Sequence, residues 1–219
     1  GAAIASNFGI ISQPEFYLGT DKISANSGNY SSMIATVTSS VNTIASQIPR
    51  AQSGLKLGMQ PDGTLKIQAR SQFFEKTSGE FYLGIYLIEN NFVGYQAGQG
   101  SNAQHKNIFR GGIGDHHFGD LLVAGSVDAD QVFDIQHTFN LNASGFQADN
   151  IEIVAVLWEK VGNRYEYVNV NSSSTIELVS ANEEVNRRVS LFQVTPNPVS
   201  AHATIRLSLS QPLDQLALD

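Results

Sequence analysis

The chain has 219 residues, no cysteine and a formal net charge of −7, and these properties exclude several classes of protein. Without cysteine the chain has no disulfide, no thiolate nucleophile and no sulfur ligand for a metal. Its basic residues are scattered singly apart from Arg187 and Arg188. No basic patch is therefore available for a nucleic-acid backbone or an anionic membrane surface. No apolar run approaches the roughly 18 residues of a transmembrane helix.

The first 50 residues differ in pattern from the remainder. FGIISQPEFYLG predicts a strand on each side of a bend at Pro14. Apolar residues at steps of three and four then predict a helix at about 29–48, which Pro49 ends. They are Met33, Ile34, Val37, Val41, Ile44, Ala45 and Ile48. Many β-branched, Ser and Thr residues lower its helix propensity, so we expect it to need packing. The chain begins GAAIAS, without Met, and we expect its targeting segment to have been removed.

Residues 51–180 carry the pattern of a β-sandwich. LKLGMQ and TLKIQARSQFF flank a Pro-Asp-Gly turn. FYLGIYLIEN and NIEIVAVLWEK are apolar on both faces and predict central strands, whereas YEYVNVNSS predicts an edge strand. About seven short strands with Gly, Asn and Asp turns predict a mainly β protein, an antiparallel immunoglobulin-like β-sandwich.

The last part of the chain changes character again. Residues 181–190 are polar and charged and predict a linker. In residues 191–219, the Pro-Asn-Pro triplet at 196–198 is not compatible with a central strand, because two N–H donors are missing. The following segment ATIRLSLS alternates and predicts another strand.

The segment HKNIFRGGIGDHHFG, residues 105–119, is the most conspicuous candidate for chemistry. It holds three of the five histidines, together with an arginine and an aspartate. His116 and His117 are adjacent and point in opposite directions in extended backbone, and no helical histidine pair is present. We therefore predict no metal and no cofactor, and expect the histidines to hydrogen-bond within a glycine-rich loop.

Other catalytic and metal patterns find little support. There is no GxSxG elbow, and GQGSN lacks the helix that a phosphate loop requires. Asp128, Asp130 and Asp134 resemble part of a calcium loop, but Val132 occupies a ligand position and the required glycine is missing. Solvated turn carboxylates are the favoured interpretation, and a calcium site built from several loops stays open. We predict that the protein is not an enzyme.

The C-terminal segment resembles the start of the type A C-terminal sorting domain used by the type IX secretion system of Bacteroidetes. The resemblance rests on Pro196-Asn197-Pro198, on the small pair Ala203-Thr204 and on the alternating Ile205, Leu207 and Leu209. It covers roughly the last 30 residues and implies export. The later strands of that domain, with their glycine turn, are not part of the sequence.

Residues from about 50 to 175 resemble the twenty-eight-kilodalton outer-membrane-protein family of the same bacteria. The carriers are LGIYLIENNFVGYQ, which contains Glu89 and Gln96, and HKNIFR, which contains His105, Ile108, Phe109 and Arg110; Gly119 and the closing strands NIEIVAVLWEK and YEYVNV follow. The family has no assigned reaction and is described as surface or envelope protein. The resemblance therefore implies a location more than a mechanism.

In that family a thioredoxin-like unit often precedes the sandwich. The strand, Pro14, strand and helix expected for residues 4–48 look like the second half of such a unit. The first half, with any CxxC motif, is absent from the sequence, so redox activity is not implied. The expected organisation is a partial thioredoxin-like segment at 1–50, a sandwich at 51–180, a linker at 181–190 and a truncated sorting domain at 191–219.

These observations predict an exported protein of the cell surface or outer membrane, or a secreted one, that acts by binding protein or glycan. The loop 96–119 is the expected binding region, because loops on a rigid scaffold carry function. The candidate residues are Gln96, His105, Arg110, Asp115, His116 and His117. Two alternatives stay open: an envelope hydrolase or accessory module that uses 105–119, and a metal or small-ligand binding protein. We expect Arg110 to be partly buried and bonded to a carboxylate or to loop carbonyls.

Overall fold

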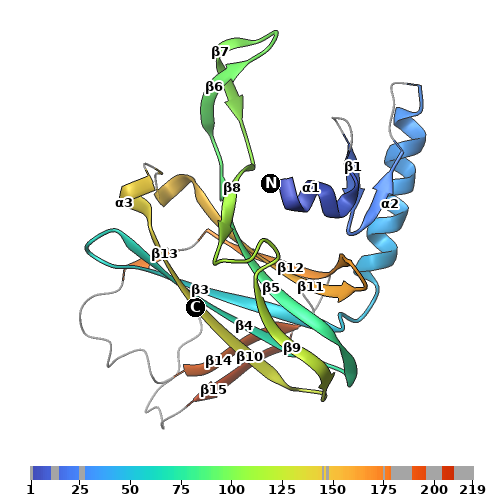
Figure 1. Cartoon of the computed structure of the whole chain (residues 1–219), viewed down its shortest axis with the longest axis vertical. Coiled ribbons are helices and arrows are strands. Elements are labelled where there is room, and N and C mark those ends of the chain that lie inside the picture. The colour runs from blue at the N-terminus through green and yellow to red at the C-terminus, as the bar shows by residue number, and fades with distance from the viewer. Residues whose placement is uncertain are drawn as a thin grey trace.

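The computed structural model describes residues 2–10, 15–24, 28–144, 146, 148–174, 176–178, 189–195 and 204–209. Within this part of the chain the protein is mainly β, and two sheets face each other across one hydrophobic core. A smaller N-terminal unit lies beside the second of these sheets (Figure 1). Nearly all strand pairs are antiparallel, as predicted for the sandwich region.

The first sheet has the strand order β10-β4-β3-β13. Its strands are β3 (Ala51–Met59), β4 (Thr64–Phe73), β10 (Val132–Asn140) and β13 (Ile176–Leu178). The predicted Pro-Asp-Gly turn joins β3 to β4, and Gly63 there has a φ of 81°. Leu65, Ile67 and Ala69 of β4 are buried, as their alternation predicts. The short strand β13 pairs with β3 in parallel.

The second sheet has the order β12-β11-β5-β8, and β9 also pairs with β5. Its strands are β5 (Thr77–Glu89), β8 (Ile108–Ile113), β9 (Asp120–Val127), β11 (Ile151–Val161) and β12 (Arg164–Ser173). The first half of β5 pairs with β9 and the second half with β8. β5 and β11 are central strands and β12 is an edge strand, which confirms three predictions from the sequence.

The core between the sheets is apolar and is built from both of them. Its largest fully buried side chains include Leu57, Leu65, Ile67, Phe73, Phe81, Leu83, Ile85, Ile151, Ile153 and Leu157. Phe73 of the first sheet meets Phe81 of the second edge to face, with ring centroids 4.8 Å apart. Aromatic pairs favour this geometry, and burial of these side chains is the main stabilising contribution to the fold.

Two asparagines of β12 close one side of the sandwich. The side-chain amides of Asn169 and Asn171 donate to the backbone carbonyls of Ala51 and Ser53 on β3, at 2.7 and 2.8 Å. Asparagine is depleted in strands because its amide competes with the backbone. Here the amides supply hydrogen-bond donors to carbonyls at the start of β3, which lies before the residues that pair with β13, Leu57 to Met59.

Between β5 and β8 the chain leaves the sheet as a hairpin of residues 92–105, which we call the arm. Its strands β6 (Phe92–Gln96) and β7 (Gly100–His105) pair with each other and project away from both sheets (Figure 1). The region expected as one loop, 96–119, thus consists of most of the arm, the strand β8 and a turn at 114–119. The glycines of β8 suggested a loop, but β8 supplies backbone partners to the second half of β5.

The N-terminal unit contains α1 (Ala2–Phe8), β1 (Phe16–Leu18), β2 (Asp21–Ile23) and α2 (Tyr30–Ala45). Of the strand expected before Pro14, residues 8–10 are described and form no strand: α1 ends at Phe8 and Gly9 lies in a turn. Alanine favours the helix, and Gly9, with a φ of 66°, ends it. The helix expected at 29–48 is confirmed with an earlier end, although no residue of α2 is buried. Pro14 itself lies outside the described residues.

The remaining elements connect and extend the sandwich. The short helices α3 (Leu141–Ser144) and η1 (Ala148–Asn150) join β10 to β11. At the C-terminal end β14 (Val189–Thr195) pairs antiparallel with β15 (Thr204–Leu209). The strand expected from ATIRLSLS is confirmed. The Pro-Asn-Pro triplet and most of the expected linker lie outside the described residues.

Candidate functional site

The outer face of the second sheet carries a cluster of aromatic side chains, which we call the aromatic face. Its buried centre consists of Tyr86 on β5, Phe118 in the 114–119 turn and Trp158 on β11. Ile4, Phe8, Tyr82, Val154, Val156, Tyr165 and Tyr167 pack around this centre. Successive side chains of a strand point to opposite faces, so Leu157 lies in the sandwich core while Trp158 points outward.

The turn 114–119 lies directly against β5 because position 119 is glycine. Gly119 has a φ of 90°, and a Cβ atom at this position would lie 1.9 Å from the carbonyl oxygen of Leu83. The Gly119 N–H donates to the carbonyl of His116 at 3.0 Å. This close approach presses Phe118 onto the aromatic face, where only 6 % of its surface is exposed.

A chain of hydrogen bonds crosses the buried centre of the aromatic face. The indole N–H of Trp158 donates to the Tyr86 hydroxyl at 3.0 Å, and this hydroxyl donates to the backbone carbonyl of His117 at 2.9 Å. Burial raises the pKa of Tyr86 to about 12, because the phenolate would lose its hydration. The network therefore holds the backbone of the turn in place through two buried polar groups.

His116 belongs to the aromatic face through its ring. Its imidazole stacks on Tyr82 with ring centroids 5.7 Å apart, and its Nδ1 accepts the backbone N–H of Phe118 at 3.2 Å. The Tyr82 hydroxyl donates to Glu80, and this hydrogen bond, with some burial, raises the pKa of Tyr82 well above its ordinary value. Lys160 donates to the same carboxylate at 3.1 Å.

An open groove of about 460 Å³ lies between α1 and the aromatic face. Its lining includes Asn7, Phe8, Phe118, Asn163, Arg164 and Tyr165. The rings of Phe118 and Tyr165 are parallel, with centroids 3.8 Å apart and an angle of 3° between their planes. The groove therefore has an aromatic wall, which continues below its surface to Trp158, 5.4 Å from the Phe118 ring.

Two of the polar side chains that line the groove, Asn7 and Arg164, differ in their surroundings. Asn7 is engaged: its amide nitrogen donates to the Tyr165 carbonyl at 2.8 Å, and its Oδ1 accepts the Tyr165 N–H at 2.7 Å. Arg164 is exposed and has no ion-pair partner among the residues that the structure describes. The groove thus combines aromatic surface with an available guanidinium group.

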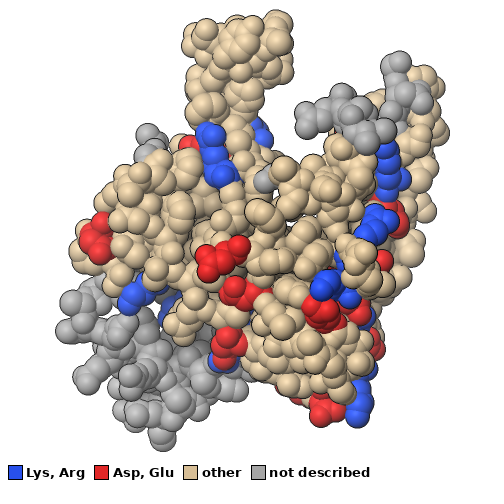
Figure 2. Space-filling view, viewed as in Figure 1, with Lys and Arg blue, Asp and Glu red and all other residues tan. Residues whose placement is uncertain are grey.

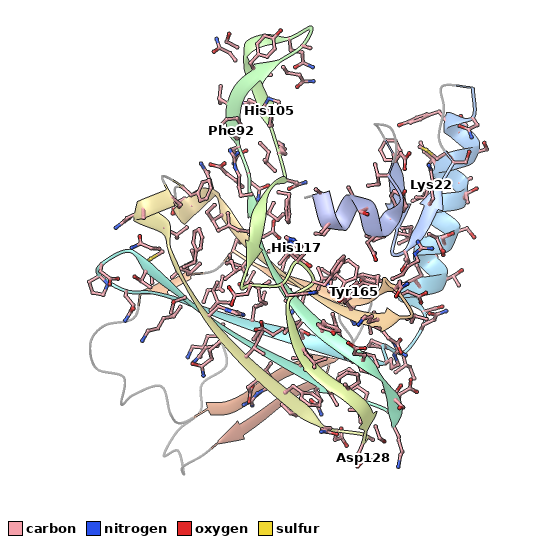
Figure 3. All side chains as sticks on the ribbon, in the orientation of Figure 1. Lys22, Phe92, His105, His117, Asp128 and Tyr165 are labelled. Carbon is pink, nitrogen blue, oxygen red and sulfur yellow. The ribbon has the colours of Figure 1, made fainter. Side chains whose placement is uncertain are left out.

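The six residues predicted for the site lie in two separate regions. Gln96, His105 and Arg110 are on the arm or at its base, and Asp115, His116 and His117 are in the turn beside the aromatic face. Figure 3 shows His105 on the arm and His117 near the sheet, with Tyr165 close by. Gln96, Asp115, His116 and His117 are exposed, whereas His105 is half-buried against Phe92.

Arg110 has the structural role that the sequence suggested. Its Nε donates to Glu89 at 2.6 Å, and a second guanidinium nitrogen also contacts this carboxylate. The Arg110 side chain is 27 % exposed and the Glu89 side chain is 10 % exposed. Counted together with its backbone, Arg110 is an exposed residue. The guanidinium also lies over the rings of Phe92 and Phe146. The prediction of a partly buried Arg110 side chain bonded to a carboxylate is confirmed, and it fixes the base of the arm.

The sequence pattern did contain a signal for the aromatic face. β5 and β11 are apolar on both faces, which requires that both faces be covered. The pattern predicts two central strands, but periodicity does not say which elements cover their second face. The cover comes from α1 and from the 114–119 turn, neither of which was expected to pack there.

Other charged clusters on the sandwich have ordinary partners. His137 and Asp120 form a hydrogen bond of 2.7 Å between β10 and β9. Asp134 pairs with Arg70, and Asp128 pairs with Lys76. Within the described residues, no group of three or more His, Asp or Glu side chains is arranged to hold a metal ion. In the same part of the chain, no helix has the length and hydrophobicity needed to span a membrane.

The fold is shared with a solved bacterial structure. HBP35 of Porphyromonas gingivalis is 17 % identical to this chain with a TM-score of 0.66, and the match covers 96 % of this chain and 67 % of HBP35. A domain of the outer membrane lipoprotein Omp28 from the same organism is 17 % identical with a TM-score of 0.43, over 61 % of this chain and 93 % of that domain. At this identity the likeness to HBP35 shows a common fold. No family model and no curated protein matches the sequence.

Proposed function

We propose that this chain is a non-enzymatic binding module of an exported protein, and that it binds its ligand in the groove between α1 and the aromatic face. The observation that carries the proposal is the combination of an aromatic wall with Arg164, an exposed cation that has no ion-pair partner among the described residues. Apolar concave surface with a few placed polar groups is the usual form of a binding site.

The chemistry of the groove selects a class of ligand. The half-buried Tyr165 offers ring surface to an aromatic or other apolar group, with the buried Phe118 stacked against it, and Arg164 offers charge-assisted hydrogen bonds to an anion. The ligand we propose is an apolar or aromatic group that carries a nearby carboxylate, sulfate or phosphate. An acidic glycan or the aromatic C-terminus of a protein would present both features.

We propose a location at the cell surface or outer membrane, or secretion from the cell. Support comes from the resemblance of residues 50–175 to the twenty-eight-kilodalton outer-membrane-protein family and of the C-terminal segment to a type IX sorting domain. The described pair β14 and β15 is compatible with the start of such a domain. Fractionation of cells that produce the full-length protein tests this location, and recovery in the soluble cytoplasmic fraction would overturn it.

The finer description of the fold is also a proposal. An immunoglobulin-like sandwich is supported by two antiparallel sheets packed over one core. A partial thioredoxin-like unit is supported by the order of a helix, two paired strands and a second helix in residues 2–45. No redox role is proposed, because the chain contains no cysteine.

The hydrolase alternative has less support than the binding module. It requires a carboxylate within hydrogen-bond reach of His116 or His117 in a deep pocket. Both histidines are exposed, and among the described residues His116 has a backbone N–H as its hydrogen-bond partner. The alternative of a metal site stays a hypothesis, which metal analysis of the purified protein tests.

Calorimetric titration with two matched probes tests the binding proposal. Naphthalene-2-sulfonate supplies a ring and an anion, and 2-naphthalenemethanol supplies the same ring without charge. We expect the sulfonate to bind at least about fivefold more tightly, and Arg164→Gln to remove that difference, because the guanidinium contact contributes about 1 kcal/mol or more. Arg70→Gln on the far sheet is the matched control. Equal affinity for both probes in the unsubstituted protein would contradict the proposal.

A further inference from the structure

The base of the arm is built to hold it away from the sheets. Asn91 and Asn107 lie at the two positions where the chain enters and leaves the arm, and both have positive φ, 59° and 55°. Asparagine tolerates this left-handed backbone better than most residues. The Asn90 side chain accepts the N–H of Asn107 at 3.0 Å, which ties the two bends together. The two bends and this hydrogen bond therefore fix the direction in which the arm projects.

The two edges of the arm differ in their ability to accept another strand. β6 and β7 pair with each other, and neither has another strand partner among the described residues. In their register Gly94 lies opposite Ala103 and Gln96 opposite Gly100, so that Tyr95 faces both Ser101 and Asn102. The extra residue is in β7, and such a bulge disturbs the outer edge of its own strand. β6 keeps a regular free edge.

The free edge of β6 lacks the features that usually protect edge strands. Residues 92–104 contain no Asp, Glu, Lys, Arg or Pro, although charged residues and proline are the common means of blocking further pairing. Figure 2 shows the outer part of the arm without charged side chains, in contrast to the rest of the molecule. Val93 and Tyr95 lie on one face of β6 and are 53 % and 74 % exposed.

We infer that β6 pairs antiparallel with β6 of a second copy of this chain, about a two-fold axis at Gly94. In this register Val93 of each copy lies opposite Tyr95 of the other, and Phe92 lies opposite Gln96. An aromatic residue opposite a β-branched residue is a favourable cross-strand pair. Gly94, with no side chain, lies opposite itself at the axis.

The choice of a second copy as the occupant follows from this symmetry and from charge. A two-fold contact requires a surface that complements itself, and the sequence from Phe92 to Gln96 meets that requirement in the Gly94-centred register. Each copy carries a net charge of −7, yet residues 92–104 contain no charged side chain, and Figure 2 shows none on the outer part of the arm. Arg110, which lies over the Phe92 ring at the base, is paired with Glu89. Two arms can therefore meet around Gly94 without repulsion between like charges.

The expected dimer is weak in dilute solution. A pair of five-residue strands buries well under the roughly 1,200 Å² that stable interfaces need. Covalent cross-linking of the transient dimer is therefore more informative than a measurement of the protein's mass in solution. The chain contains no cysteine, so an introduced thiol reports only on the contact at its own position.

The test uses the variants Val93→Cys and Tyr95→Cys, purified separately and oxidised with copper phenanthroline at high protein concentration. Opposed residues in an antiparallel pair have Cα atoms about 4.5–5.5 Å apart, within the range of a disulfide, whereas diagonal positions lie beyond it. We expect the mixture of the two variants to yield at least about tenfold more disulfide-linked dimer than either variant alone. Trp158 fluorescence checks that the fold is unchanged.

Asn102→Cys on the bulged strand is the matched control and should cross-link with neither variant. Equal yields in the mixture, the single variants and the control would mean random collision and would overturn the proposal. Cross-linking of Val93→Cys to itself as efficiently as to Tyr95→Cys would also overturn it, because that result requires another register or another occupant.

Discussion

At the scale of single residues, the 114–119 turn depends on one position that tolerates only glycine. At Gly119 a methyl group would overlap the carbonyl of Leu83, and the backbone has a φ of 90°. We expect Gly119→Ala to destabilise the protein by about 3 kcal/mol or more, measured by urea unfolding. Gly111→Ala is the control, because nothing lies within 4 Å of the added methyl group. Equal effects at the two positions would contradict this account of the turn.

The pair of Arg110 and Glu89 gives a second test at the residue scale. Removing the guanidinium leaves the largely buried Glu89 carboxylate without its partner, so we expect Arg110→Ala to cost about 2–3 kcal/mol in urea unfolding. Arg70→Ala removes a partner from a pair whose side chains are 42 % and 53 % exposed, and should cost less than about 1 kcal/mol. Adding Glu89→Gln to Arg110→Ala should restore part of the loss. If Arg110→Ala is as mild as Arg70→Ala, the structural role is wrong.

At the scale of elements, the N-terminal unit protects the free edge of β12. Asn7 satisfies the N–H and the carbonyl of Tyr165, and the hydroxyl of Thr20 accepts the N–H of Tyr167 at 3.0 Å. Side chains from α1 and from the β1–β2 turn thus take the place of a further strand. An edge covered in this way does not recruit another chain, in contrast to the edge of β6.

Hydrogen exchange measures this protection residue by residue. We expect Asn7→Ala to speed exchange of the Tyr165 amide by about tenfold, because a bond of about 1 kcal/mol or more is lost. The Tyr167 amide, held by Thr20, is the internal control and should change much less. Unchanged exchange at Tyr165 would show that α1 does not cover the edge in solution.

The elements also show how far the sequence predicts the structure. Strict alternation in β4 and two-sided hydrophobicity in β5 and β11 predict the sandwich. Successive side chains of a strand point to opposite faces, so the pattern of apolar residues shows whether one face or both are buried. For Arg110 the sequence predicts a carboxylate or loop carbonyls as partners, and the partner in the structure is the Glu89 carboxylate. The aromatic face was not predicted, because it forms when α1 and the 114–119 turn, more than a hundred residues apart, pack on the same strands. The described start of the strand expected before Pro14 is no strand, because α1 runs to Phe8 and Gly9, with positive φ, ends it in a turn.

At the scale of the whole molecule, stability should fall at alkaline pH through Tyr86. Its ordinary pKa is about 10, and burial raises it to about 12 in the folded protein. Because the folded pKa is the higher one, the stabilisation is fully present below about pH 10 and is lost as the pH rises through about 12. We expect a decrease of about 2–3 kcal/mol across this window in urea unfolding. The decrease should be smaller in Tyr86→Phe, and an equal decrease would assign it to other groups.

The central claim is that the groove beside the aromatic face binds an aromatic anion. Titration of labelled protein with naphthalene-2-sulfonate, followed by amide and indole NMR shifts, tests it most directly. The account predicts saturable shifts at Phe118, Arg164 and Tyr165 and at the Trp158 indole, with Val93 and Tyr95 of the arm unaffected. Saturable shifts confined to residues outside the groove, or no shifts at all, would contradict it.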